Sequence, residues 1–182
     1  MEPVDINGVH KMAAEWYHRI YHQAYGLRTV TLRLTNTYGP RMRVKDSRHG
    51  FIGWWIHQVV RGREIEIFGT GQQMRDFNYV DDVVEALLLA AAHPDTDGQV
   101  YNLGGDEPIS LAELAQLLVD VNGGGSYRLV PFPTDRQRID IGDYYGDFSR
   151  IRAQLGWQPR VSLREGLART LAFYREFGDH YW

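Results

Sequence analysis

Apolar side chains recur along this 182-residue chain with a spacing that changes from one segment to the next. Over residues 7–25 they return every three to four positions, which predicts an amphipathic helix ended by Gly26. Over residues 27–34 apolar and polar residues alternate, a pattern typical of a strand. The same criteria predict helices at 51–61 and 82–93 and short strands at 65–68, 100–103 and 127–130.

Two further helices are predicted by the residues at their starts. Ser110 is followed by Glu113, and Ser162 by Glu165, in the spacing of a capping box. In this motif the serine and glutamate side chains reciprocally bind backbone N–H groups that the first helical turn leaves without partners. Glycines at or near positions 123 and 178 end the amphipathic runs that follow.

Strands that alternate with helices of about 10 to 15 residues indicate an α/β fold with at least partly parallel pairing. A length of 182 residues fits one domain, and no repeat or low-complexity linker divides the chain. We therefore expect a single domain over residues 1–182. Loops are expected at 41–50, 94–98 and 131–144.

Composition narrows the class of protein. Lysine and arginine number 20 and aspartate and glutamate 23, so a formal charge of −3 does not favour a nucleic-acid partner. The sequence contains no cysteine, which favours a reducing, cytoplasmic setting. The longest apolar run, 86–92, is far shorter than the roughly 20 residues of a membrane span, and the N-terminal residues do not form a signal-peptide pattern.

Four short motifs stand in order along the chain, and each joins glycines to polar, charged or aromatic side chains. They are 33–40 (RLTNTYGP), 68–82 (FGTGQQMRDFNYVDD), 101–105 (YNLGG) and 155–159 (LGWQP). In this order they resemble the C-terminal part of the NAD-dependent epimerase/dehydratase family, the extended short-chain dehydrogenases/reductases that act on nucleotide-diphosphate sugars. The resemblance covers nearly the whole chain. It implies the substrate-binding part of a Rossmann-like fold without the N-terminal dinucleotide-binding strands.

The resemblance assigns the polar contacts of a nucleotide sugar to Arg75 and Asn36. Arg75 matches the family arginine that meets the diphosphate, a task suited to a planar, permanently charged donor. The alternative is a surface arginine paired with an aspartate at 76, 81 or 82. Asn36 matches an asparagine beside the sugar or diphosphate, and the alternative is a residue of the turn before Gly39.

Three apolar residues are implied at the nucleotide base. Ile65 and Phe68 fall where the family has a short strand that frames the base, with core packing as the alternative. Phe51 matches a segment that closes over the nucleotide. The loop before it carries basic residues that either bind phosphates or are simply solvated, namely Arg41, Arg43, Lys45 and Arg48.

A fourth segment, 136–143 (RQRIDIGD), is similar to the Arg-x-Gly-Asp-like stretch in which the family arginine reaches the substrate. Asp143 and the glycine before it match. Asp140 stands where the family has arginine, so Arg138 would substitute for it only by a shift of two residues.

The residues that the resemblance implies for catalysis are altered. The family carries Tyr-x-x-x-Lys on the helix that opens this chain, and the lysine lowers the tyrosine pKa and holds the cofactor ribose. Lys11 matches, but Asn7 stands in the tyrosine position. Asparagine cannot ionise, and loss of a positioned base typically costs about 10²- to 10⁴-fold in rate. His10 is the nearest titratable candidate for a base.

The sequence also has no glycine-rich dinucleotide motif, since Gly123, Gly124 and Gly125 follow a helix rather than join a strand to one. We therefore expect that this chain alone does not hold NAD in the ordinary way. No metal site is expected either, because His18 and His22 have no third ligand at a suitable spacing.

Asp81 and Asp82 form a pair of carboxylates that invites a catalytic interpretation. Helix capping explains them more simply, because Asp82 with Glu85 has the spacing that opens a helix.

Three hypotheses follow. The first is a nucleotide-sugar binding domain without NAD chemistry of its own. The second is one piece of a complete 4-epimerase or 4,6-dehydratase, associated with a missing N-terminal half. The third is a non-catalytic assembly module, in which the first helix packs a homodimer through aromatic and aliphatic side chains, namely Trp16, Tyr17, Ile20 and Tyr21.

Overall fold

The structure, a computed structural model, describes residues 3–47, 50–138 and 140–182. The helices are α1 (Ile6–Tyr25), α2 (Phe51–Val60), α3 (Val80–Ala92), α4 (Leu111–Asn122), α5 (Thr134–Gln137), α6 (Ser149–Leu155) and α7 (Leu163–Phe177), with 3-10 turns η2 (Pro94–Thr96) and η3 (Gly178–His180). The strands are β1 (Val30–Arg33), β2 (Asn36–Tyr38), β3 (Ile65–Phe68), β4 (Met74–Arg75), β5 (Phe77–Tyr79), β6 (Gln99–Asn102), β7 (Ile109–Ser110) and β8 (Tyr127–Val130).

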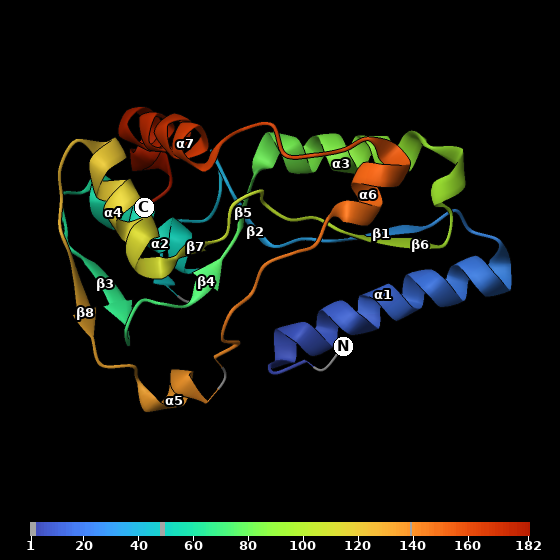
Figure 1. Cartoon of the computed structure of the whole chain (residues 1–182), viewed down its shortest axis with the longest axis horizontal. Coiled ribbons are helices and arrows are strands. Elements are labelled where there is room, and N and C mark those ends of the chain that lie inside the picture. The colour runs from blue at the N-terminus through green and yellow to red at the C-terminus, as the bar shows by residue number, and fades with distance from the viewer. Residues whose placement is uncertain (1–2, 48–49, 139) are drawn as a thin grey trace.

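The strands pair two by two. β1 with β6, β2 with β5 and β3 with β8 are parallel, and β4 with β7 is antiparallel. In Figure 1, α3 lies above the β1–β6 pair and α1 below it, while α2, α4 and α7 gather at the other end of the molecule. The predicted α/β organisation with partly parallel pairing is confirmed.

The larger hydrophobic core lies among α2, α4, α7 and the strands β2, β3 and β5. Tyr38 and Tyr174 are buried there, and each hydroxyl donates to a backbone carbonyl, that of Leu163 at 3.3 Å and that of Met42 at 2.6 Å. A side chain at Gly166 would overlap the Tyr38 hydroxyl, so a glycine lets α7 approach β2 this closely.

A smaller core joins α3, β6 and α6, with Tyr101, Leu103 and Trp157 at its centre. The Trp157 indole N–H donates to the Asp82 carbonyl at 2.9 Å, and the Asp82 carboxylate accepts from the Val161 N–H at 3.1 Å. These two bonds tie the segment between α6 and α7 to the start of α3.

Helix α1 extends over 20 residues, and none of its side chains is buried. Asp5 caps its start by accepting from the Gly8 N–H at 2.7 Å. Polar contacts hold the helix beside β1. Arg33 makes a two-pronged ion pair with Glu15 at 2.8 and 2.6 Å, and the Thr29 hydroxyl donates to the His18 carbonyl at 3.1 Å.

Most predicted helices and strands are confirmed, although several begin or end at other residues than the local patterns predict. Strands 65–68 and 127–130 match, and the capping box of Ser110 and Glu113 is complete. Ser162 accepts from the Glu165 N–H as expected, while the Glu165 carboxylate pairs with Arg169. The strand expected at 27–34 is limited to Val30–Arg33.

The expectation that Asp82 opens a helix is wrong. Helix α3 begins at Val80 after Tyr79, and no side chain caps it. Asp82 instead lies in the first turn, 3% exposed, where its carboxylate binds the Val161 amide. The Asp82 carboxylate therefore binds a backbone N–H that is distant in the sequence, although the local spacing predicts that it caps the start of the helix.

The sequence analysis missed several short elements. β2, β4 and β5 lie inside motifs interpreted as loops, and β7 and α6 were not predicted. Two of the three predicted loops also contain helical turns, η2 within 94–98 and α5 within 131–144. The missed strands have only two or three residues, too few alternations to reveal a period, and the seven residues of α6 make only about two helical turns.

Core burial predicts a sharp contrast between two leucines on helices. Leu114 in α4 is 0% exposed, whereas Leu88 in α3 is 66% exposed. We expect Leu114→Ala to lower the free energy of unfolding by about 2 to 5 kcal/mol and Leu88→Ala to change it by no more than about 0.5 kcal/mol. Urea denaturation followed by circular dichroism measures both, and equal losses would contradict the assigned core.

Candidate functional site

Arg75 is the central side chain of the candidate site, and it is 6% exposed. One guanidinium nitrogen, Nη1, donates to the Met74 carbonyl at 2.8 Å and to the Gly142 carbonyl. The other, Nη2, lies 3.9 Å from the Asp140 carboxylate, beyond hydrogen-bond distance. The guanidinium is thus oriented through Nη1, while Nη2 makes no hydrogen bond to the Asp140 carboxylate.

The ion-pair partner of Arg75 differs from the aspartates named in the sequence analysis. The structure pairs Arg75 with Asp140, not with the aspartates at 76, 81 or 82. Burial lowers the pKa of the Arg75 guanidinium, while the carboxylates of Asp140 and Asp143 oppose that shift. The residue that stands where the family has an arginine therefore supplies a negative charge to this site.

Asn36 begins β2, which pairs with β5 so that Asn36 is opposite Phe77, two residues after Arg75. Its side-chain amide donates to the Asp76 carbonyl at 3.0 Å. This bond joins Asn36 to the residue directly after Arg75. The parallel pairing of β2 with β5 therefore brings Asn36 to the residue that follows Arg75, although 39 positions, from 36 to 75, separate the two predicted polar residues in the sequence.

Asp143 also joins this group. Its carboxylate accepts from the Met74 N–H at 2.8 Å, and the Tyr144 N–H donates to the Met74 carbonyl at 3.0 Å. Residues 142–144 thus lie against β4, where Arg75 and Tyr144 form a parallel bridge. Arg138, the other residue predicted in this segment, is exposed.

The three apolar residues expected at a base have different surroundings. Ile65 is 0% exposed in the larger core, the environment that the core-packing alternative predicts. Phe68 is half-buried, and its ring centroid lies 5.8 Å from that of Phe132. Phe51 is also half-buried and packs edge-on against Trp55 and Phe77, at 5.0 and 6.2 Å.

The basic residues before α2 lie in the loop that the sequence analysis considered for phosphate binding. Arg43 is exposed and pairs with Asp46 at 3.0 Å, and Lys45 is exposed. Arg48 lies outside the described residues. The pair at Arg43 is consistent with the solvated alternative for this loop.

The residues expected to carry catalysis lie on the exposed first turns of α1. Asn7, His10 and Lys11 are all exposed, and the Asn7 amide donates to the Asp5 carboxylate at 3.3 Å. Asn7 is therefore engaged with the residue that caps the helix.

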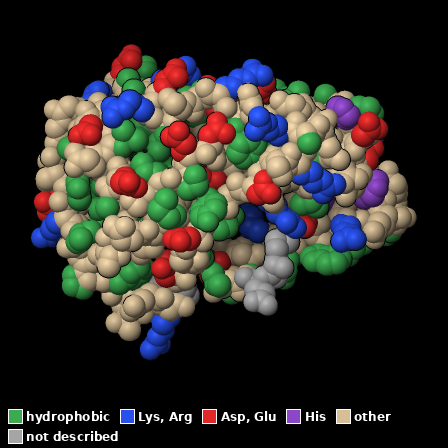
Figure 2. All heavy atoms as spheres, viewed as in Figure 1, with side chains coloured by type: hydrophobic (Ala, Val, Ile, Leu, Met, Phe, Trp, Pro, Cys, Tyr) green, Lys and Arg blue, Asp and Glu red, His purple; other side chains and the backbone are tan. Residues whose placement is uncertain are grey.

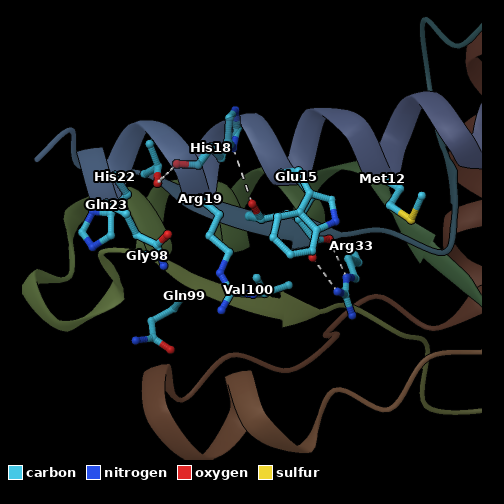
Figure 3. Close-up of a pocket in the computed structure, with 13 residues that line it drawn as sticks. Met12, Glu15, His18, Arg19, His22, Gln23, Arg33, Gly98, Gln99 and Val100 are labelled. Atoms are coloured by element: carbon cyan, nitrogen blue, oxygen red, sulfur yellow. Dashed lines mark hydrogen bonds and ion pairs between the residues drawn. The ribbon is translucent and has the colours of Figure 1, made fainter. Parts of the chain in front are cut away.

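A hollow of about 460 Å³ lies between α1 and the β1–β6 pair, and Figure 3 shows the Glu15–Arg33 ion pair within it. His18 and His22 line this hollow as well. Their ring Nδ1 atoms lie 3.4 Å from the Thr31 hydroxyl and 2.9 Å from the Leu27 carbonyl. Over residues 3–47, 50–138 and 140–182, no three His, Cys, Asp or Glu side chains group as metal ligands would.

A second hollow, of about 710 Å³, lies along α4 beside the N-terminal end of α7 and is lined by side chains that include Glu107 and Arg160. Neither Arg75 nor Asn36 lines either hollow. The face in Figure 2 shows acidic and basic side chains interspersed, without a strip of one sign.

Comparison with known proteins places the motifs in a family. The model of the NAD dependent epimerase/dehydratase family matches residues 2–104, more than half of the chain. The chain belongs to this family. Its fold is that of part of an extended short-chain dehydrogenase/reductase.

Individual members of the epimerase/dehydratase family show the extent of the match. A dTDP-glucose 4,6-dehydratase of Actinoplanes is 34% identical over 155 residues, 85% of this chain and 46% of its own. The UDP-glucose 4-epimerase of Thermotoga maritima, solved with UDP-glucose, is 34% identical with a TM-score of 0.81, over 93% of this chain and 53% of that one.

DesIV, a dTDP-glucose 4,6-dehydratase of Streptomyces venezuelae solved with NAD and TYD, is 28% identical, with a TM-score of 0.87 over 100% of this chain and 54% of that one. The chain spans about half the length of the curated relatives that it matches. In the part that the structure describes, no helix is both long and apolar enough to cross a membrane.

Sequence reasoning overlooked one residue of this region, Asp76. It was weighed only as an ion-pair partner for Arg75, yet it is completely buried and binds three separate segments. Its position in the motif RDF gave the available signal, since a carboxylate between two buried residues must find donors inside the protein.

The ion pair between Glu15 and Arg33 predicts a pH dependence of stability. The hydrogen bond from Arg33 lowers the pKa of Glu15 below its ordinary value of 4.5, the charge of Arg33 adds to the effect, and burial opposes it. A carboxylate with a lowered folded pKa stabilises the fold above its unfolded pKa, and this contribution is lost as the pH falls through the folded pKa. Glu15→Gln should therefore cost up to about 1 kcal/mol at pH 7 and much less at pH 3.

Urea midpoints of the parent and the Glu15→Gln variant at both pH values measure this difference. An equal loss at pH 7 and pH 3 would show that the charge of Glu15 does not hold α1.

Proposed function

We propose that this chain binds the diphosphate and sugar of a nucleotide-diphosphate sugar where β2, β4 and β5 meet, with Arg75 and Asn36 as the polar contacts. The observation that carries the proposal is the buried guanidinium of Arg75 with Nη2 beyond hydrogen-bond distance of Asp140. A buried charge is costly unless it is paired and hydrogen-bonded. An anionic group of a ligand would supply the missing bonds.

The chemistry of both side chains supports a diphosphate beside a sugar. Arginine offers a planar fork of donors that matches phosphate oxygens, and the Met74 and Gly142 carbonyls fix the plane of that fork. Asn36 uses its amide nitrogen on the Asp76 carbonyl, which leaves its amide oxygen to accept from a sugar hydroxyl. Family members solved with UDP-glucose or with NAD and TYD support the same ligand class.

The described residues do not fit an NAD site by themselves. Of the groups that the resemblance assigns to the cofactor, this chain supplies Lys11, whose side chain is exposed on α1. One exposed ammonium can contact a ribose but cannot cradle a diphosphate, which requires converging backbone N–H groups. We therefore propose that the chain alone does not carry out sugar oxidation.

An enzymatic role belongs to the alternative that this chain is one part of a complete 4-epimerase or 4,6-dehydratase. The relatives with those names, matched over about half of their length, support it. In such an assembly Lys11 would contact the cofactor ribose. Asn7 would not act as the base there, because an amide does not ionise, and His10 is one position along the helix from Lys11.

Titration calorimetry with UDP-glucose and dTDP-glucose tests the binding proposal. We expect Arg75→Ala to weaken the tighter of the two by about tenfold or more, because a charged hydrogen bond to phosphate is lost. Asp140→Asn should tighten binding, because it removes a carboxylate that competes for Arg75. The control Arg128→Ala removes an exposed arginine paired with Glu64 and Glu66 and should leave affinity unchanged.

Absence of binding by the parent chain to both sugars would overturn the proposed function. Equal losses in Arg75→Ala and Arg128→Ala would overturn the role of Arg75.

Exposed side chains on α1 favour a second function, assembly into a homodimer or with another part of an epimerase/dehydratase. Trp16, Tyr17, Ile20 and Tyr21 are between 47% and 63% exposed. Positions 16 and 20, and 17 and 21, are one turn apart, so these side chains form one stripe along the helix. Grouped apolar side chains of this size are typical of protein interfaces.

We therefore expect light scattering to give the mass of a dimer or a larger assembly. Ile20→Asp should shift the protein towards the monomer, because it places a charge in the stripe. Leu88→Asp changes another exposed apolar residue, on α3, and should leave the mass unchanged. A monomer at high concentration would contradict assembly through α1 in this chain.

A further inference from the structure

We propose that Asp76 is a positioning residue, whose buried carboxylate holds residues 103–105 and 142–146 around Arg75 and Asn36. The inference rests on the proposed function for its effect on affinity. The positioning itself follows from contacts within the chain.

Asp76 is 0% exposed, and a single carboxylate oxygen, Oδ2, accepts two backbone bonds. One comes from the Gly105 N–H at 2.8 Å and the other from the Gly146 N–H at 3.0 Å. The carbonyl of the same residue accepts from the Asn36 amide at 3.0 Å. Three segments that are far apart in the sequence thus meet at one residue.

The glycines explain how two backbones reach one oxygen. A side chain at Gly104 would overlap the carbonyl oxygen of Gly146, and a side chain at Gly146 would overlap that of Leu103. A side chain at Gly105 would lie 2.8 Å from the carbonyl oxygen of Phe77. The backbones at Gly104, Gly105 and Gly146 lie too close to their neighbours for any side chain at these positions. The Asp76 carboxylate accepts the N–H groups of Gly105 and Gly146 where these backbones meet.

Residues 142–146 are held at both ends by consecutive residues of one short segment. At one end the Asp143 carboxylate accepts from the Met74 N–H, and the Gly142 carbonyl accepts from Arg75. At the other end Gly146 donates to Asp76. Release of the Asp76 end would let residues 142–146 move, and with them the carbonyl that orients the Arg75 guanidinium.

The second carboxylate oxygen, Oδ1, is buried and has no hydrogen-bond partner among the described residues. Asparagine keeps an oxygen that can accept both glycine amides, and its NH2 group takes the place of Oδ1 without breaking a hydrogen bond, at a cost in stability for the buried donor. This makes Asp76→Asn a conservative variant that separates loss of the bonds from loss of the charge.

A matched control lies at the other buried carboxylate of the same motif. Asp82 is 3% exposed and accepts from the Val161 N–H at 3.1 Å, between α6 and α7. Asp82→Ala removes a buried carboxylate bound to backbone, as Asp76→Ala does, but it releases no segment that contacts Arg75 or Asn36.

The experiment measures backbone amide exchange and UDP-glucose affinity for the parent, Asp76→Ala, Asp76→Asn and Asp82→Ala, well below each unfolding midpoint. In Asp76→Ala we expect exchange at 103–105 and 142–146 to rise about tenfold or more, while α2, α4 and α7 keep their protection. Affinity should fall about tenfold or more in this variant, because the Arg75 guanidinium loses its fixed orientation. Asp76→Asn and Asp82→Ala should bind within about threefold of the parent.

Unchanged exchange in both segments of Asp76→Ala would overturn the proposal, as would the same local pattern in Asp82→Ala. If Asp76→Ala does not fold, Asp76→Asn decides, since a tenfold loss of affinity with unchanged exchange would show that the charge, not the positioning, matters. If the parent binds no UDP-glucose, the proposed function fails, and exchange alone shows whether Asp76 holds the two segments.

Discussion

The parallel pairing of β2 with β5 is the constraint on which the rest of the molecule depends. Tyr38 of β2 and Phe77 of β5 belong to the larger core, while α3 after β5 is part of the smaller core and β1 before β2 packs against it. The pair therefore joins the two cores. It also sets Asn36 opposite Phe77, and this register brings the Asn36 amide to the Asp76 carbonyl. A shift of one residue would turn the side chains of β2 to the opposite face.

The electrostatics around Arg75 explain why a buried cation is tolerated here. Two carbonyl oxygens bind one guanidinium nitrogen, and the carboxylates of Asp140 and Asp143 oppose the pKa shift that burial causes. The Asp140 contact at 3.9 Å is too long for a hydrogen bond, so its effect is mainly Coulombic. These bonds fix the plane of the guanidinium without using all of its donors.

Local sequence patterns predicted the elements whose periodicity is long enough to detect. The helix at 7–25 and the strands at 65–68 and 127–130 correspond to α1, β3 and β8, because each carries a full local signal. β4 has only two residues, and its partner β7 has two, so no alternation reveals them. At Asp82 a local signal predicts a helix cap that the structure does not contain. The carboxylate accepts instead from the N–H of Val161, 79 positions away.

The same limit applies to the candidate site and to α1. Resemblance named Arg75, Asn36 and Asp143, and the structure gathers them around β4, but the role of Asp76 depends on glycine amides 29 and 70 positions away that no local pattern links to it. Helix α1 lies outside this network and meets β1 mainly through polar bonds. A helix without buried side chains gains little stability from hydrophobic burial. Most helical stability in proteins comes from the packing of an apolar face. Association through the exposed apolar stripe of α1 would therefore stabilise this helix most.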